Sequence, residues 1–186
     1  VYKRQTPVFV YTNYPTAELF INGKSYGKQS KNNSSLKSRY RLMWMDAVYE
    51  PGEVKVVAYN KDGKAVAEKT VRTAGKPHHI ELVSNRNELT ADGKDLAYVT
   101  VKVVDKDGNL CPTDSRLIHF SVKGAGKFRA VANGDPTNLE QFHLPKMHAF
   151  HGMLTAIVQA GEIAGDLVLT AKASGVKTGT VHLQAK

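Results

Sequence analysis

The chain has 186 residues, of which 41% are hydrophobic and 23% charged, an ordinary balance for globular protein that excludes wholesale disorder. A single cysteine, Cys111, excludes both a disulfide framework and a cysteine-rich zinc site. No apolar run approaches the roughly 20 residues of a membrane-spanning helix, and no signal peptide is recognisable, so we expect no membrane partner. The sequence opens with strand-like residues and no Met, which favours a fragment of a longer protein.

The net charge of +9 is concentrated in the first part of the chain. Residues 1–75 hold 13 Lys/Arg and 6 Asp/Glu, whereas residues 76–186 hold 13 and 11. Between Glu18 and Asp46 there are basic side chains and no acid, and such a surface attracts phosphate groups. No RNA-binding motif or recognition helix accompanies it. We therefore expect a solvated basic face, or one that faces an acidic domain, and no nucleic-acid partner.

Residues 17–28, AELFINGKSYGK, predict a β-hairpin. Asn22-Gly23 is the strongest two-residue turn signal, because both turn residues must adopt positive φ. This turn places Leu19 and Ile21 on one face of the hairpin. It sets three cross-strand pairs: Ile21 with Lys24, Phe20 with Ser25, and Leu19 with Tyr26.

Residues 39–45, RYRLMWM, fit two patterns. Tyr40, Leu42 and Trp44 alternate as they would along a strand. A helical stripe is also available, formed by Leu36, Tyr40 and Met43. We predict a strand, because the run is short and its flanks are turn-like.

Further strands are predicted at residues 7–13, 53–60 and 65–73, the last two around the turn Lys61-Asp62-Gly63. The small residues and proline of Ala74-Gly75-Lys76-Pro77 then predict a domain boundary. The two predicted domains are a small β-sandwich accessory domain at 1–75 and an immunoglobulin-like domain at 76–186. A domain as small as the first is only marginally stable alone, so we expect it to be stabilised by contact with a neighbouring domain.

The second half shows short strands separated by turn residues about every 8–12 positions. Val99, Val101 and Val103 alternate with other residues, as in a half-buried sheet. No convincing amphipathic helix is found, and residues 134–150 have no strand pattern. The sequence thus predicts an all-β fold of two tandem immunoglobulin-like β-sandwich domains. Strands in the second domain are expected at residues 79–85, 96–105, 117–124, 128–133, 153–160, 166–173 and 178–185.

Reactive residue types are present, but none forms a recognisable catalytic pattern. Glycoside hydrolysis needs two carboxylates about 5–9.5 Å apart. The acids here are mostly turn residues, where aspartate caps local amides (Asp62, Asp92 and Asp107). The sequence has neither a GxSxG nucleophile motif nor a glycine-rich phosphate loop. We predict no catalytic residue and no cofactor.

Three histidines, His143, His148 and His151, occur within the run HLPKMHAFH. Histidine is a common metal ligand, but this spacing matches no standard motif and no carboxylate is fixed beside it in the sequence. We therefore predict no metal site. Cys111 follows a turn, and we expect it to be a small hydrophobic residue at a strand edge rather than a nucleophile.

Tyr40, Trp44 and Tyr49 form the main concentration of aromatic residues. Presented outward, their rings could stack on sugars, so they are the tentative carbohydrate-binding residues. A single tryptophan in a small sandwich is more usually its core anchor. The exposure of Trp44 distinguishes the two interpretations.

Six sequence segments carry a resemblance to a known family. Three lie in the first half: AELFINGKSYGK, YRLMWMDAVYEPGEVKVVAYNKDGK and VRTAG. Three lie in the second half: IELVSNRNELTADGKDLAYVTVKVVDKDGNLCP, NGDPTNLEQF and AFHGMLTAIVQA. The first three resemble the small β-domain downstream of the catalytic barrel in bacterial family 2 glycoside hydrolases. The others are similar to the C-terminal immunoglobulin-like domain of these β-galactosidase-like enzymes, which are common in gut Bacteroidetes. The resemblance covers nearly the whole chain.

The resemblance implies a non-catalytic scaffolding region. The family's two catalytic glutamates lie in the (β/α)₈ barrel, and nothing here matches their motifs, so no catalytic residue is carried over. The implied partner is the catalytic barrel of the same parent chain. The resemblance implies that the parent is a retaining hydrolase of terminal β-linked sugars, and that it is periplasmic, extracellular or at the cell surface. His148 and His151 stand where the family has small or basic residues, which further argues against a metal. The alternative is an autonomous carbohydrate-binding module that uses Trp44 and the neighbouring tyrosines.

Overall fold

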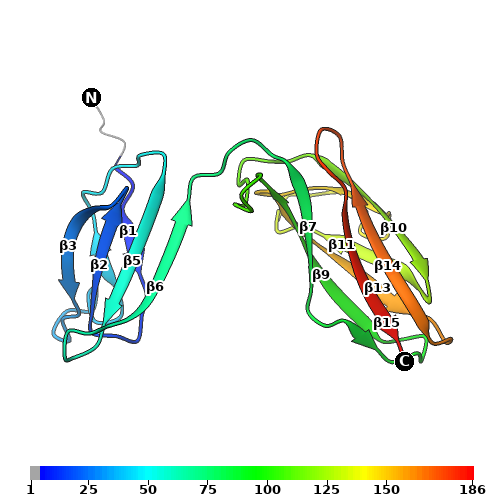
Figure 1. The fold of residues 1–186 in the computed structure, drawn as a ribbon, viewed down its shortest axis with the longest axis horizontal. Helices are drawn as coiled ribbons and strands as arrows, with labels where there is room; N and C mark the ends of the chain where they lie inside the picture. The colour runs from blue at the N-terminus through cyan, green and yellow to red at the C-terminus, as the bar shows by residue number, and fades with distance from the viewer. Residues whose placement is uncertain (1–4) are drawn as a thin grey trace. The chain divides into compact units, whose positions relative to one another are not determined.

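The computed structural model describes residues 5–186, and these form β-strands joined by turns and loops (Figure 1). The predicted all-β fold is confirmed, since no helix occurs in this part of the chain. The chain divides into two compact units. Unit 1 ends at Thr73 and unit 2 comprises Ala74–Lys186.

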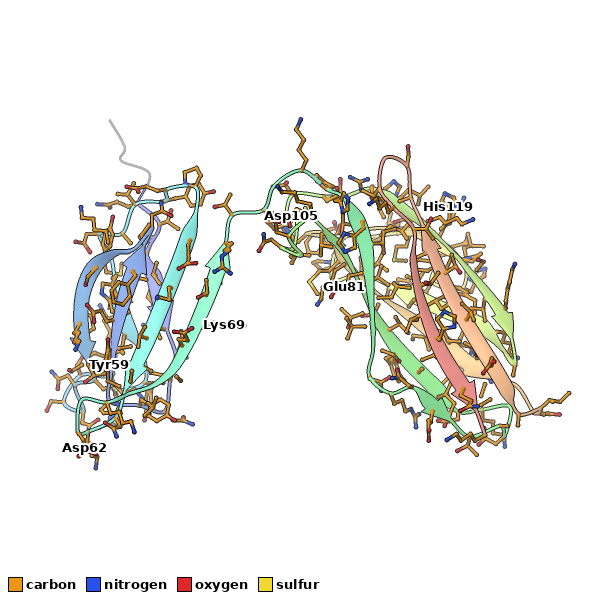
Figure 2. All side chains as sticks on the ribbon, in the orientation of Figure 1. Tyr59, Asp62, Lys69, Glu81, Asp105 and His119 are labelled. Atoms are coloured by element: carbon orange, nitrogen blue, oxygen red, sulfur yellow. The ribbon has the colours of Figure 1, made fainter. Side chains whose placement is uncertain are left out.

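Unit 1 contains a four-stranded antiparallel sheet in the order β3-β2-β5-β6 and a separate two-stranded antiparallel ribbon, β1-β4. Leu42 and Trp44 of the ribbon share a hydrophobic core with residues of β2 and β5, so the ribbon packs on the sheet. Strand β6 is exposed along nearly its whole length, and its Lys69 is labelled in Figure 2. The strands are β1 Val8–Val10, β2 Thr16–Ile21, β3 Lys24–Ser30, β4 Leu42–Trp44, β5 Glu53–Tyr59 and β6 Ala65–Arg72.

The predicted hairpin is β2-β3, and most of its register is as expected. Ile21 pairs with Lys24, and Asn22 and Gly23 have φ of 49° and 79°. The predicted pair Leu19–Tyr26 is replaced by a bulge, because the register shifts between Glu18 and Phe20. Leu19 therefore lies opposite two residues, Tyr26 and Gly27, and the second has a φ of 86°.

Gly23→Ala tests the turn. We expect it to lower the free energy of unfolding of unit 1 by about 1 kcal/mol, because alanine is strained at positive φ. The added methyl group would itself meet no neighbour. The measurement is urea unfolding followed by tryptophan fluorescence, since the chain's single tryptophan lies in unit 1. The control is Leu36→Ala in the same unit, where the side chain is 82% exposed and its removal should leave the midpoint unchanged. Equal midpoints for Gly23→Ala and the parent chain would contradict the turn assignment.

Unit 2 is built from two sheets, in the orders β12-β10-β14-β15-β8 and β11-β13-β9-β7. All pairs are antiparallel except β8 with β15. The strands are β7 His79–Ser84, β8 Glu88–Leu89, β9 Leu96–Val104, β10 Leu117–Gly124, β11 Gly126–Ala132, β12 Lys146–His148, β13 Met153–Ala160, β14 Gly165–Lys172 and β15 Gly179–Ala185.

The core of unit 2 lies between its two sheets. Val99, Val101 and Val103 of β9 are fully buried, as their alternation predicted, and β13 alternates buried and half-buried residues along its whole length. Leu167 and Leu169 of β14 join the same core from the other sheet. Two inward faces that interdigitate in this way define a β-sandwich.

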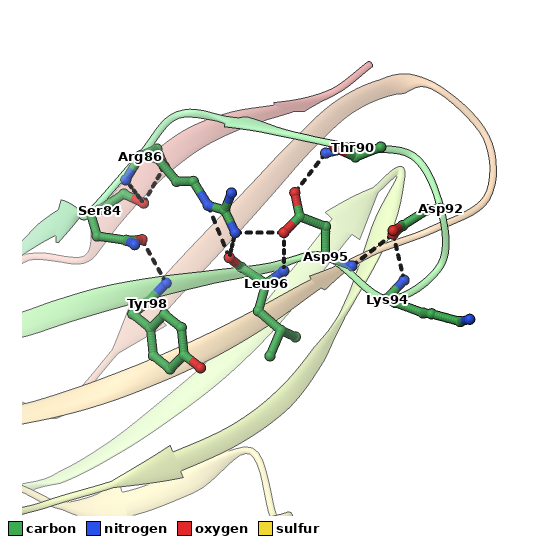
Figure 3. A network of polar contacts seen from close by, with 9 residues as sticks. Ser84, Arg86, Thr90, Asp92, Lys94, Asp95, Leu96 and Tyr98 are labelled. Atoms are coloured by element: carbon green, nitrogen blue, oxygen red, sulfur yellow. Dashed lines mark hydrogen bonds and ion pairs between the residues drawn. The ribbon is translucent and has the colours of Figure 1, made fainter.

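A polar network fastens the segment between β7 and β9. Figure 3 shows the Arg86 guanidinium between the carbonyl oxygen of Leu96 and the carboxylate of Asp95, to which it donates hydrogen bonds of 2.6 and 2.5 Å. Asp95 also accepts from the Thr90 amide at 2.8 Å. This last bond, helped by Arg86 and opposed by burial, lowers the pKa of Asp95 below its usual value. The network orders an otherwise irregular strand-to-strand connection.

Candidate functional site

Trp44 is a core residue. Its side chain is 2% exposed, and its Nε1–H donates to the carbonyl oxygen of Gly27, at the bulge of β3, over 3.1 Å. The inclusion of Trp44 among the tentative carbohydrate-binding residues was therefore wrong, because a ring inside the core cannot stack on a sugar. The alternative interpretation of Trp44 as the core anchor of the first domain is confirmed.

Tyr40 and Tyr49 are exposed, by 65% and 49%. Strand β4 begins only at Leu42, so Tyr40 precedes the strand. The prediction that Tyr40 shares the inward face of Leu42 and Trp44 was therefore wrong. The Arg39 guanidinium lies 5.8 Å from the Tyr40 ring centroid, whereas the Tyr49 hydroxyl hydrogen-bonds Thr73 Oγ1 over 3.0 Å. Within residues 5–186 the two tyrosines take different partners and make no hydrogen bond to each other. A carbohydrate-binding role for Tyr40 and Tyr49 stays a prediction.

Cys111 belongs to the core of unit 2 and is 3% exposed. Burial, together with the charges of Asp105 and Asp114, raises the pKa of its thiol above the usual value. A neutral, enclosed thiol is a poor nucleophile. Its predicted role as a small hydrophobic residue is confirmed.

The segment of residues 133–150, hereafter the polar loop, comprises the longest connection in unit 2 and the short strand β12. It is held together by its own side chains. Asp135 Oδ1 accepts from both the amide and the hydroxyl of Thr137, at 2.9 and 2.7 Å. Asn133 donates to the carbonyl oxygen of His148 over 2.9 Å, which ties the start of the loop to its end. The Thr137 bonds hold the pKa of Asp135 below its usual value, so this carboxylate is charged at neutral pH.

Two histidines of the loop region take different partners. His148 Nδ1 lies 3.1 Å from Glu140 Oε1, and the His148 amide donates to Glu140 Oε2 over 3.1 Å. Burial raises the pKa of Glu140, but the His148 contacts outweigh it and the net shift is downward. His151 Nδ1 instead contacts the carbonyl oxygen of Pro112 at 3.2 Å. Among residues 5–186 no group of three His, Cys, Asp or Glu side chains is arranged to hold a metal ion.

The polar loop and Ser115 line an open pocket of about 520 Å³, hereafter the polar-loop pocket. Its wall combines charged, amide, hydroxyl and aromatic groups. The Asn138 amide nitrogen is buried in this region and has no hydrogen-bond partner within residues 5–186. The residues that supply polar or aromatic groups are Ser115, Asn133, Asp135, Thr137, Asn138, Glu140, His148 and Phe150.

Beside this pocket lies an exposed apolar surface. Leu139 and Phe142 of the polar loop are 96% and 55% exposed and line a depression of about 630 Å³ together with Leu96 and Ile157. Ile157 pairs with Tyr98 on the outer side of the sheet, and Tyr98 is 46% exposed. We call these five residues the outer apolar patch. Apolar side chains grouped on a surface commonly mark an interaction site.

The described part of the chain is strands and loops, so it offers no helix with the length and hydropathy to cross a membrane.

The fold defines an all-β protein of two compact units, and comparison with known proteins gives its family. Residues 80–182 match the family model described as glycoside hydrolase family 2 C-terminal domain 5, and residues 3–67 match a domain of unknown function. The chain belongs to the C-terminal region of the family 2 glycoside hydrolases.

The relatives agree with this family. A β-galactosidase of Bacteroides ovatus is 42% identical over 176 residues, which is 95% of this chain and 20% of the relative. The structure of a family 2 glycosyl hydrolase from Bacteroides cellulosilyticus is similar with a TM-score of 0.86 and 33% identity, over 97% of this chain and 23% of that one. The structure of a β-glycosidase from Bacteroides vulgatus is similar with a TM-score of 0.89 and 28% identity, over 98% of this chain and 23% of that one. The chain spans about a fifth of the length of the first curated relatives.

Proposed function

We propose that this chain is the non-catalytic C-terminal accessory region of a family 2 β-galactosidase-like glycoside hydrolase. The observation that supports it most directly is the match of residues 80–182 to the family's C-terminal domain 5, in a chain that aligns over 95% of its length with about a fifth of a relative named as a β-galactosidase. The two functional parts are the small domain at 1–75 and the immunoglobulin-like domain at 76–186. The parent enzyme would hydrolyse terminal β-linked sugars with retention, on glutamates of a separate barrel domain.

The accessory role predicts that the chain alone is inactive. When the 186-residue protein is incubated with a chromogenic β-galactoside, we expect no release of chromophore above the buffer blank. A glycosidase active site needs an acid and a nucleophile in defined separation. The carboxylates Asp95, Asp105 and Asp114 are instead committed to local hydrogen bonds. Turnover that scales with protein concentration would overturn the proposal.

The outer apolar patch is the surface on which we propose that the catalytic barrel docks. Leu139 is almost fully exposed in a loop whose other residues are held by hydrogen bonds. A leucine held outward in this way gains no burial within its own unit, whereas burial against a second domain would stabilise the assembly by roughly 2 kcal/mol.

Leu139→Asp in the longer parent polypeptide tests the docking. We expect the thermal midpoint of the barrel to fall by several degrees, because a charge would be forced into an apolar interface. In the 186-residue chain the same change should leave the midpoint nearly unaltered, since the side chain is 96% exposed there. Tyr40→Asp, at an exposed aromatic of unit 1, is the control. An unchanged midpoint in the parent polypeptide would place the docking surface elsewhere.

A further inference from the structure

We propose that the polar-loop pocket binds a neutral saccharide unit. The inference does not depend on the accessory role, because it concerns chemistry within unit 2. The pocket is also distinct from the predicted aromatic site, whose residues Tyr40 and Tyr49 belong to unit 1.

The first argument is that the pocket is built in advance. Its volume of about 520 Å³ is within the range of small-molecule sites. Both ends of the polar loop are fixed, by the bond from Asn133 to the His148 carbonyl and by the two contacts between Glu140 and His148. Asp135 is fixed in turn by Thr137. A preorganised wall loses little conformational entropy when a ligand enters, which favours binding.

The second argument is the set of polar groups that remain unused. Asp135 Oδ2, Ser115 Oγ and His148 Nε2 make no hydrogen bond within residues 5–186, although other atoms of Asp135 and His148 do. Together they offer a charged acceptor, a hydroxyl and a ring nitrogen. Sugar hydroxyls donate and accept hydrogen bonds at once, so a polyhydroxylated ligand matches this mixed set.

The third argument is apolar. Phe150 is half-buried, lines the same pocket and packs edge-on against the His151 ring, with centroids 4.2 Å apart. A pocket wall that combines one aromatic ring with a few placed polar groups suits a ligand with both an apolar and a polar face. A pyranose ring has both, since its C–H groups and its hydroxyls project in different directions.

Charge selects among saccharides. Asp135 and Glu140 are both ionised at neutral pH, since the ordinary pKa of a carboxyl group lies far below 7 and local hydrogen bonds lower both pKa values further. An anionic sugar such as glucuronate would be repelled by them, whereas galactose would not. A divalent cation is disfavoured for another reason. Calcium takes six to eight oxygen ligands, but both Glu140 oxygens and Asp135 Oδ1 already accept hydrogen bonds.

The test is a titration of the ¹⁵N-labelled 186-residue chain with galactose, with glucuronate and with Ca²⁺, followed by amide chemical shifts. With galactose we expect saturable shifts confined to the polar loop and to Ser115, with a dissociation constant on the order of 1 mM. Glucuronate should bind at least about tenfold more weakly. Galactose shifts that map to unit 1, saturation by Ca²⁺ at far lower concentration, or no saturable shift with galactose would each overturn the proposal.

Two variants make the result specific. Asp135→Asn keeps the oxygen that holds Thr137 but replaces the unused carboxylate oxygen with an amide, and Ser115→Ala removes a hydroxyl that makes no bond to the loop. Each should weaken galactose binding roughly tenfold while the remaining amide shifts show an intact fold. Ile163→Ala is the matched control in the same unit, at a side chain that is 79% exposed and does not line the pocket, and it should leave the affinity unchanged. Unaltered affinity in both pocket variants would overturn the site, yet would leave the docking of the outer apolar patch intact.

Discussion

Trp44→Ala is expected to unfold most of unit 1 at room temperature. The side chain is the largest fully buried one in the unit, and its core is small: Ala17, Leu19, Ile21, Leu42, Trp44, Ala47 and Ala58. Truncating a buried tryptophan costs about 3–5 kcal/mol, through lost apolar burial and the cavity that remains. Loss of the Nε1–H also leaves the Gly27 carbonyl without this donor. The sum approaches the whole stability of a domain this small.

The measurement is a ¹H–¹⁵N spectrum of the variant, in which the amides of residues 5–73 should collapse to random-coil shifts. The free energy of unfolding of unit 1 in Trp44→Phe should lie between those of Trp44→Ala and the parent chain. An aromatic ring is retained, but the hydrogen bond to Gly27 is lost, which costs about 1 kcal/mol. Tyr40→Ala is the exposed control and should leave unit 1 folded. A dispersed spectrum with an unchanged urea midpoint for Trp44→Ala would show that the ring is not the anchor of this core.

Unit 1 shows which structural features local sequence patterns can predict. Asn22-Gly23 fixed the hairpin correctly, because a two-residue turn with positive φ is a local property of those residues. The bulge at Tyr26 and Gly27 was not predicted, although a glycine inside a strand is a signal for one. Tyr40 was assigned to the face of Trp44 by alternation alone. Alternation has no meaning outside a strand, and where β4 begins depends on its pairing with β1, which is a tertiary contact.

The candidate site was harder to predict than the fold. The stretch 134–150 was expected to have no strand, yet Lys146–His148 forms β12 and buries Met147 completely. Three residues are too few for a periodic signal. The polar loop owes its shape to contacts between residues distant in sequence, such as Asn133 with His148. Only its first residues, Asn-Gly-Asp-Pro-Thr-Asn, carried a local signal, since these types favour turns stabilised by side chains.

Asp105 is expected to be the most sensitive position of unit 2. It directly follows β9 and is labelled in Figure 2. Asp105 is only 2% exposed. Its carboxylate accepts hydrogen bonds from the backbone amides of Gly75, Asp107 and Asn109, at 2.7, 2.9 and 2.8 Å respectively. Asp105→Ala would leave these amides without their acceptor, and we expect a fall in the thermal midpoint on the order of 10 °C. Asp105→Asn should cost less, because one acceptor oxygen remains.

Because Asp105 is charged, its contribution to the stability of unit 2 depends on pH in a defined direction. The Gly75 amide and the Asn109 side chain outweigh burial and hold the pKa of the carboxyl far below its usual range. A lowered folded-state pKa stabilises the protein above the unfolded-state value, near 3.9, and this contribution is lost as the pH falls toward the folded-state pKa. The gap in thermal midpoint between the parent chain and Asp105→Asn should therefore be full at pH 7 and narrow progressively below about pH 4. Circular dichroism follows the unfolding of both units, and Trp44 fluorescence follows unit 1 alone. The fluorescence midpoint is the internal control and should be the same in both proteins, so the difference in the circular dichroism midpoint belongs to unit 2. A gap that stays constant down to pH 3 would mean that the three amides stabilise the shape of this turn and not the charge of its carboxylate.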